Sequence, residues 1–334
     1  MRYTMNTVRL PAAPSQLVLE HGLPAFGMYE GIVEQVDWLP LKTTLYQRLT
    51  RKLHHKRWQY AAIAHPDYFI GAAIVDVGWT GTAFAYLFDR QRREVVGATS
   101  ANGLPGLSAK MEDRAFGNAS FTAGSCRMAF QRKRDHLTLT IQSPKLRLTA
   151  DIQLAGMPPV LASIAPANWL AHSTHKSGGL KVSGTADCPH KRYALDGAVA
   201  SLDYSNGLLA RETHWRWASA HSREMGFNLQ QGYMGDAENA VWLHGKLIRV
   251  GAVEFDFDAK QPLQPWHIRS ANRQVDLTFT PEGARSENKN LLIAASRYIQ
   301  PIGHFDGEIV DPDTGIRHAV QGLPGVTEDH TSRW

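Results

Sequence analysis

The chain has 334 residues, of which 43% are hydrophobic and 20% are charged. This length suits one large domain or two ordinary ones, and the composition excludes a disordered or fibrous protein. Lysine and arginine number 36 against 31 acids, which gives a formal net charge of +5. The excess is local, because six cations and no acid lie between Trp38 and Pro66. A single basic segment argues against nucleic acid as a partner, which would require a basic face built from several elements.

The N-terminus and the cysteines bear on location. Residues 1–15 contain prolines where a signal peptide would have its apolar core, so we expect no export by that route. Cys126 and Cys188 are too few for a disulfide framework, which favours reduced thiols and a cytoplasmic location. No apolar run approaches the roughly 18–20 residues that a membrane-spanning helix needs.

The basic segment is predicted to be an amphipathic helix over about residues 41–57. Leu41, Leu45, Leu49 and Leu53 recur every fourth residue and form one stripe, with the cations on the other face. The favoured interpretation is a surface helix that docks through its leucines and leaves its basic face solvated. The alternative is a peripheral contact with an anionic membrane surface or an acidic partner.

Most of the remaining chain is predicted to form short antiparallel strands. The first half contains strand patterns at 58–64, 68–77, 82–88, 135–141 and 145–154, and the run at 68–75 is apolar enough for a buried strand. The second half repeats the style at 198–204, 213–220, 225–231, 240–244, 247–257, 275–280, 291–297 and 304–310, with Gly-containing turns between them. Such spacing is typical of sandwiches and barrels.

Residues 156–180 lack a clear pattern and are rich in Pro, Gly and Ser, which predicts a domain boundary or a long crossover. We therefore expect an all-β protein with two calycin-like or lipocalin-like antiparallel barrels and one early helix. The predicted domains are residues 1–165, which include the helix, and residues 166–334.

The sequence carries none of the usual motifs for dinucleotide binding, nucleotide hydrolysis, zinc proteolysis or serine hydrolysis. His172, His175, Cys188 and His190 could be assembled into a zinc site, but no element fixes their spacing and no C-x-x-C pair is present. We therefore predict neither a metal nor a cofactor.

The densest group of chemically active residues lies between Leu202 and Ala218. Trp215 and Trp217 share one face of a predicted strand, and His214 and Arg216 share the other. The two indoles could line an apolar pocket, with each N–H available to a ligand. A carboxyl group near them, that of Asp203, would have its pKa raised by desolvation and could act as a general acid. The alternative is that the tryptophans belong to an ordinary core and that Asp203 caps a turn.

Further candidate residues lie outside this group. Asp187 and His190 fall in a predicted loop, where functional groups and merely solvated ones are both common. The C-terminal segment carries Glu328, His330 and Trp334, so we expect Trp334 to dock on the body and the other two to reach a cavity. The alternative for this segment is a frayed chain end.

Several short segments have a combined spacing that is fairly specific: Lys56–Tyr60, Asp67–Gly71, Asp76–Trp79, Tyr86–Asp89, Asp203–Gly207, His214–Ala218, Glu328–His330 and Arg333–Trp334. With them the chain resembles, over nearly its whole length, a bacterial and fungal family known only as a domain of unknown function, number two-eight-zero-four. That resemblance implies no activity.

The Asp-aromatic pair, the glycine turn and the W-x-W strand are also similar to the carotenoid hydratase and AttH-like group, mainly over residues 180–260. This similarity implies two lipocalin-like barrels and hydratase or cyclase chemistry on lipophilic compounds. It aligns Asp203 with a polar site residue and Trp215 and Trp217 with the tryptophan strand. This chain has Asp-Tyr where that group often has Asp-His.

The leading hypothesis is an enzyme that moves a proton on a small lipophilic or polyketide-like substrate, by hydration, isomerisation or cyclisation. Asp203 would be the acid or base, with Tyr204 or His214 as its polar partner. Trp215 and Trp217 would form the apolar wall, and the remaining predicted ligand-binding residues are Arg216, Asp187, His190, Glu328 and His330. Two alternatives stay open: a carrier of a hydrophobic ligand, and a membrane-surface or scaffold protein.

Overall fold

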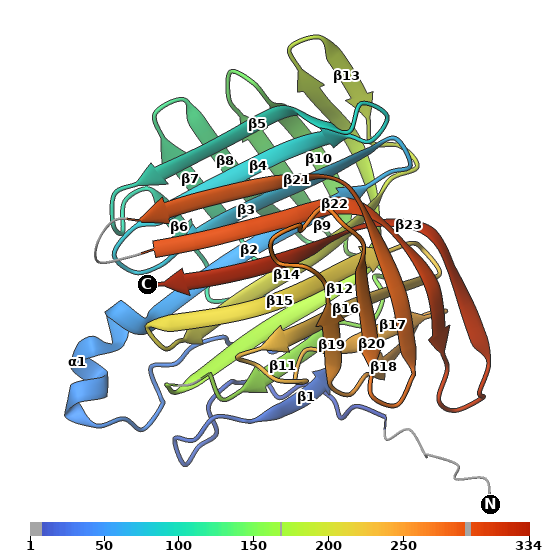
Figure 1. The fold of residues 1–334 in the computed structure, drawn as a ribbon. Helices are drawn as coiled ribbons and strands as arrows, with labels where there is room; N and C mark the ends of the chain where they lie inside the picture. The colour runs from blue at the N-terminus through green and yellow to red at the C-terminus, as the bar shows by residue number, and fades with distance from the viewer. Residues whose placement is uncertain (1–8, 168, 291–294) are drawn as a thin grey trace, which may run out of the picture.

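A computed structural model describes residues 9–167, 169–290 and 295–334, and two antiparallel sheets account for most of them (Figure 1). The first sheet is a nearly closed barrel whose main path runs β5-β4-β3-β2-β14-β12-β10-β9-β8-β7-β6. Its strands are β1 (Gly27–Glu30), β2 (His55–Ala64), β3 (Tyr68–Asp76), β4 (Gly81–Asp89), β5 (Glu94–Gly103), β6 (Ala109–Met111), β7 (Ala119–Ala123), β8 (Cys126–Lys133), β9 (His136–Gln142), β10 (Arg147–Gln153), β11 (Leu161–Ala165), β12 (Ala171–Cys188), β13 (Lys191–Ala194) and β14 (Val199–Leu208).

The second sheet is a half-barrel ordered β18-β17-β16-β15-β23-β22-β21-β20-β19. Its strands are β15 (Glu212–His221), β16 (Met225–Gly232), β17 (Ala240–Leu243), β18 (Lys246–Arg249), β19 (Val253–Asp256), β20 (Trp266–Ser270), β21 (Val275–Asn290), β22 (Ala295–Val310) and β23 (Arg317–Arg333). The predicted all-β fold with two barrel-type sheets is thereby confirmed.

The chain passes from the first sheet to the second between Leu208 and Glu212. The pattern-poor region at 156–180 is therefore no crossover, because it contains β11 and most of the long strand β12. Residues 172–177 of β12 are polar yet almost fully buried, so they lack the alternation from which a strand is predicted. The division of domains at residue 165 stays a prediction, but residues 171–208 hydrogen-bond within the first sheet.

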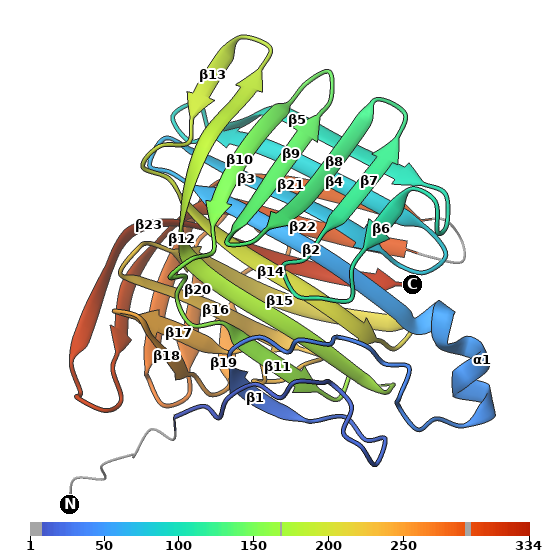
Figure 2. The ribbon, with the colours of Figure 1, turned by 180° about the vertical axis from the view of Figure 1, so that it is seen from behind.

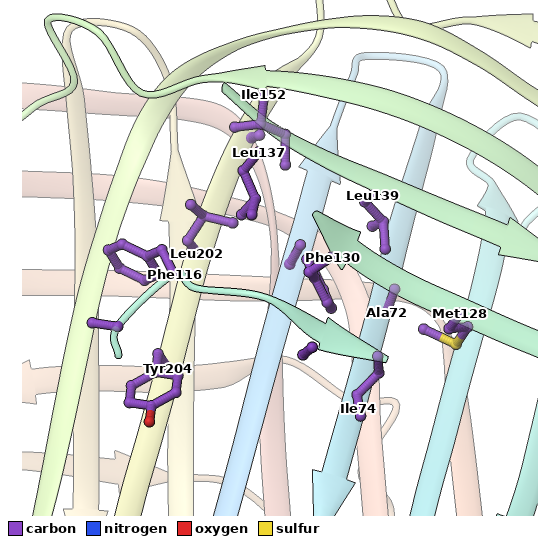
Figure 3. Packing of buried hydrophobic residues seen from close by; sticks show 14 of the residues in the cluster. Ala72, Ile74, Phe116, Met128, Phe130, Leu137, Leu139, Ile152, Leu202 and Tyr204 are labelled. Carbon is purple, nitrogen blue, oxygen red and sulfur yellow. The ribbon is translucent and has the colours of Figure 1, made fainter. Parts of the chain in front are cut away.

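Apolar side chains pack inside the barrel, on the second sheet and between the two sheets. Strands β2–β5 face the second sheet in Figure 1, and Figure 2 shows β6–β10 on the opposite side of the barrel. The barrel interior holds the largest core, in which Leu202, Phe130 and Ile74 pack together (Figure 3). A separate core, with Phe227 and Phe305, belongs to the second sheet.

A third cluster lies between the two sheets. It joins Phe69 and Phe88 of the first sheet to Trp217, Ile302 and Val326 of the second. Strand β3 is consequently covered on both faces, and its first seven residues are all buried. This arrangement confirms the buried strand predicted from the apolar run at 68–75.

The helix is shorter than predicted. Helix α1 (Leu45–His54) begins with a capping box in which Thr44 and Gln47 bond reciprocally, and cations occupy its last turn. It ends at His54 because residues 55–57 pair with β14 as the start of β2. Lys56 is consequently buried, donates to the carbonyl oxygens of Leu53 and Val77, and has its pKa lowered to about 8 by burial.

Two predictions touch residues that are not described. The first four residues of the strand predicted at 291–297, and residues 1–8 of the N-terminal segment, lie outside the described ranges. Within those ranges, no helix is both long and apolar enough to cross a membrane.

Candidate functional site

A cavity of about 130 Å³ lies between the two sheets, beside the third apolar cluster. Its size is close to that of cavities that admit a single aromatic ring. Its lining comes from both sheets and from the C-terminus: Trp58, Tyr60, Ala73, Val75, Phe84, Lys176, Asp203, Trp215, Trp217, Gln230, Tyr233, Glu238, Tyr298, Gln300, Glu328, His330 and Trp334. The sequence had predicted that the paired tryptophans face the interior of a barrel. They face the space between the two sheets instead.

Strand register in the second sheet brings several of these residues into one row. Trp215 of β15 stands opposite His330 of β23, and His330 stands opposite Tyr298 of β22. The next row inward pairs Trp217 with Glu328. Because every second residue of a strand shares a face, the two rows point into the same cavity.

Aromatic rings form one wall. The rings of Trp58 and Trp215 are stacked with centroids 6.4 Å apart, and Tyr60 meets Trp217 edge-on at 5.9 Å. The indole N–H of Trp215 donates to Glu328 Oε1 at 2.8 Å, and that of Trp217 donates to Asn228 Oδ1 at 2.7 Å. Both donors are thus used within the protein, which corrects the expectation that they are available to a ligand.

A buried ionic cluster forms another wall. Lys176 Nζ lies 2.6 Å from Asp203 Oδ2 and 2.9 Å from Glu238 Oε2, and the three side chains are 7%, 14% and 5% exposed. Burial alone would lower the pKa of Lys176, but the two carboxylates outweigh it and raise that pKa, so the amine stays charged. Burial raises the pKa of Glu238 despite the opposing effect of Lys176. Glu238 is therefore a buried carboxyl group that holds its proton more tightly than a solvated one.

Glu328 is the centre of a second polar group. Besides the indole of Trp215, its carboxylate accepts a hydrogen bond from Gln300 Nε2 at 2.9 Å and lies 3.3 Å from His330 Nδ1. The hydroxyl of Tyr86 donates to Gln300 Oε1. Three neighbours thus fix the position and orientation of this carboxylate at the edge of the cavity, and Tyr86 in turn holds Gln300.

Polar atoms without partners also line the cavity. Gln230 is 3% exposed, and its side-chain amide oxygen and nitrogen have no hydrogen-bond partner among the described residues. The hydroxyls of Tyr60 and Tyr298 lie near Tyr86 and Arg285 but make no hydrogen bond of regular geometry there. An unpaired buried amide is costly, so this part of the lining is suited to an oxygen-bearing ligand.

His172 supports the cavity from behind. Its Nδ1 lies 2.6 Å from the hydroxyl of Tyr233, which lines the cavity. Burial, followed by the nearby charge of Lys176, lowers the pKa of His172 to about 3. The ring is therefore neutral and holds Tyr233 without adding charge. Among the described residues, no group of three or more His, Cys, Asp and Glu side chains converges as a metal site would require.

Five of the predicted site residues line the cavity together: Asp203, Trp215, Trp217, Glu328 and His330. Trp334 also reaches it, where its indole N–H donates to Thr213 Oγ1, so the chain end is anchored and not frayed. Sequence reasoning missed Lys176, Glu238 and Gln230. Lys176 lies in the polar part of β12, Glu238 lies in a turn, and Gln230 had no local signal that distinguished it from other strand residues.

The structure places the other five predicted residues elsewhere. Tyr204 points into the barrel core (Figure 3), because it alternates with Asp203 along β14, and its hydroxyl donates to the Glu112 carbonyl oxygen. His214 and Arg216 alternate with the tryptophans and therefore lie on the far face of β15, against Asp329.

Asp187 and His190 lie in the β12–β13 hairpin, where Asp187 pairs with Arg192 and His190 is exposed. Asp187 stands two residues before the turn of the hairpin at Pro189, and it does not line the cavity. These two residues therefore do not join the cavity.

Comparison with known proteins gives the fold relatives and the family. The crystal structure of "a putative AttH" from Nitrosomonas europaea is similar with a TM-score of 0.56 and 13% identity, over 87% of this chain and 96% of that one. The crystal structure of kievitone hydratase from Nectria haematococca has a TM-score of 0.45 and 9% identity, over 90% of this chain and 95% of that one. The first likeness is one of fold. None of the curated proteins matches the sequence significantly.

The family predicted from the short motifs is confirmed, since a family model matches residues 9–334, nearly the whole chain. The chain therefore belongs to the family described as Domain of unknown function (DUF2804).

Proposed function

We propose that the cavity between the sheets binds a small lipophilic, oxygen-bearing substrate and that the protein is a hydratase-type enzyme. The observation that carries the proposal is the buried Asp203–Lys176–Glu238 cluster beside a wall of indoles. The similarity of the Asp203 and tryptophan motifs to the carotenoid hydratase and AttH-like group agrees with this chemistry, and the AttH structure shares the fold.

In this proposal Glu238 is the proton donor, because burial raises its pKa. Its proton forms a C–H bond with the electron pair of a substrate double bond, and positive charge develops on the neighbouring carbon. The indole faces of Trp215 and Trp217 stabilise that charge. Water then forms the C–O bond and returns its second proton to the cluster, which restores Glu238.

Lys176 and Asp203 act as positioning residues. Lys176 fixes both carboxyl groups through its two short contacts. Gln230 would orient the substrate, since its amide has both a donor and an acceptor to offer to a hydroxyl or carbonyl group. The role predicted for Asp203 from the sequence, that of direct acid or base, passes to Glu238 in this assignment.

The test begins with native mass spectrometry of the full chain, to identify any co-purified hydrophobic molecule. The guest, or a panel of small alkenes and oxygenated aromatic compounds, is then incubated with the protein in D2O. Hydratase chemistry predicts a mass gain of one water and deuterium on carbon. Glu238→Gln should lower turnover by about 10²- to 10⁴-fold, the usual contribution of a general acid, with little change in ligand affinity.

Asp187→Asn is the matched control, because Asp187 is a carboxylate paired with a cation outside the cavity, and it should keep full turnover. Ligand binding without any turnover in the wild-type protein, or Glu238→Gln that matches wild type in both respects, would refute catalysis and leave a carrier. Absence of any binding at the cavity would refute both functions.

A further inference from the structure

Helix α1 presents its polar face to the protein and its leucines to solvent. The ring of His54 stacks on Trp169 with centroids 3.8 Å apart, and its Nδ1 lies 2.6 Å from the carbonyl oxygen of Leu209. On the same side of the helix, Arg51 donates to Thr43 Oγ1 in the segment that leads into the helix. The attachment of α1 to the body is therefore made by polar and aromatic groups.

The leucine stripe lies on the outer face. Leu45, Leu49 and Leu53 are 63%, 75% and 61% exposed, and Tyr46 beside them is 68% exposed. Among these leucines and Leu41, only Leu41, which precedes the helix, is buried. The prediction that the helix docks through its leucines is therefore wrong, because the docking contacts come from the opposite face. Contiguous exposed apolar side chains of this kind mark an interaction surface.

The charge around the stripe selects the partner. Arg48 and Lys52 are exposed one turn apart beside the leucines, and Lys42 is exposed just before the helix. No acid lies within residues 38–66, so nothing in this segment neutralises these cations. An apolar face bordered by cations is the pattern of helices that lie in the interface of an anionic bilayer.

The position of α1 fits a membrane contact. It projects from the body in Figures 1 and 2, at the edge where β2 and β15 begin and β23 ends. Trp58, Trp215 and Trp334 of the cavity lie close to those same strand ends. A surface bound by α1 would therefore meet the edge of the molecule at which the cavity lies.

We propose that α1 binds an anionic lipid surface, with Leu45, Tyr46, Leu49 and Leu53 inserted among the acyl chains and Arg48 and Lys52 at the headgroups. The helix of ten residues would lie in the membrane plane over about 15 Å, at 1.5 Å per residue. This proposal goes beyond the cavity chemistry and holds whether or not the cavity is catalytic.

Vesicle flotation of the full chain tests the proposal. The protein should float with vesicles of phosphatidylcholine mixed with phosphatidylglycerol, bind phosphatidylcholine alone far more weakly, and be released from the mixed vesicles at high salt. Arg48→Glu with Lys52→Glu should weaken binding to the mixed vesicles by at least about 30-fold, since each lost cation accounts for roughly a fivefold change.

Leu49→Glu tests insertion separately from charge, and Leu263→Glu is its control. Leu263 is also an exposed leucine, at 53%, but lies between β19 and β20 in the second sheet. Both variants add the same charge to the protein, so only Leu49→Glu should lose more than about tenfold in vesicle affinity. Wild-type protein that does not float with the mixed vesicles, or equal losses in the two variants, would overturn the proposal. A normal circular dichroism spectrum of Leu49→Glu ensures that its loss reflects the surface and not the fold.

Discussion

Replacing Lys176 by methionine tests whether the ionic cluster is as desolvated as its geometry indicates. The lysine makes contacts of 2.6 and 2.9 Å with two carboxylates, and none of the three side chains is more than 14% exposed. Removing one partner of a buried ion pair costs about 3–5 kcal/mol, because the remaining charge has neither water nor a counter-ion. An exposed pair would cost only about 0–1 kcal/mol.

The pH dependence of the loss in stability makes this cost recognisable in urea unfolding. The loss in Lys176→Met should shrink as pH falls, because Glu238, whose pKa burial already raises, becomes neutral more readily once the cation is gone. Burial already raises the folded-state pKa of Glu238, so its contribution to stability is fully present below its ordinary pKa and is lost as pH rises through the folded one. Removing the lysine also removes the positive charge that lowers the pKa of Glu238, so this pKa should rise further in the variant.

The triple variant Lys176→Met, Asp203→Asn, Glu238→Gln provides the internal check. It keeps the volume of the cluster and carries no charge, so it should recover at least half of the loss in the single variant, since neutral replacements of buried ion pairs are often tolerated. Equal losses in the single and triple variants would assign the effect to packing. A loss below about 1 kcal/mol in Lys176→Met would mean that water reaches the cluster.

Two further predictions concern stability. Burial lowers the pKa of His172, His175 and His221 to about 3, so the stability that their neutral rings contribute is present above about pH 6.5 and is lost as pH falls toward 3. The free energy of unfolding should therefore fall by roughly 4 kcal/mol per pH unit for the three rings together. Urea unfolding across this range should show that this dependence on pH is reduced by about a third in His221→Gln, and a free energy of unfolding that does not change with pH would contradict the assignment. A Cβ at Gly226 would lie 2.0 Å from His221 Nδ1, so Gly226→Ala should lower the melting temperature by the equivalent of about 1–3 kcal/mol, whereas Gly251→Ala, with no atom within 4 Å, should leave it unchanged.

The fold was predictable where one face of a strand is buried and the other is solvated. Strands β9 and β10 alternate strictly between buried and less buried residues, and this period of two is visible in the sequence. Strand β12 was not predictable, because it is covered on both sides over residues 171–180 and carries polar side chains there. Their burial depends on partners in β11 and β14, which no local pattern reveals.

The residues of the candidate site were also predictable only in part. Alternation placed Trp215 and Trp217 on one face and His214 on the other, as the structure does. Alternation does not show which face of β15 packs against the other sheet. The tryptophans were for this reason predicted to lie inside a barrel. Lys176, Asp203 and Glu238 meet only because β12, β14 and the turn after β16 converge, and each residue by itself resembles an ordinary surface charge.

The strand faces between the two sheets change character along their length, and this change limits where a ligand can fit. On β23 the same face carries Val326 and then Glu328 and His330, and on β22 the face that carries Ile302 continues to Gln300 and Tyr298. The inner end of this row is almost completely buried, with Val326 at 1% and Ile302 at 0% exposure. A ligand larger than the present cavity would have to displace the packed end at Val326 and Ile302 or extend toward the opposite end of the row. Extension toward the opposite end leaves the apolar contacts intact. The cavity should therefore enlarge toward the strand ends that carry Trp58, Tyr298 and Trp334, which lie at the same edge of the molecule as α1.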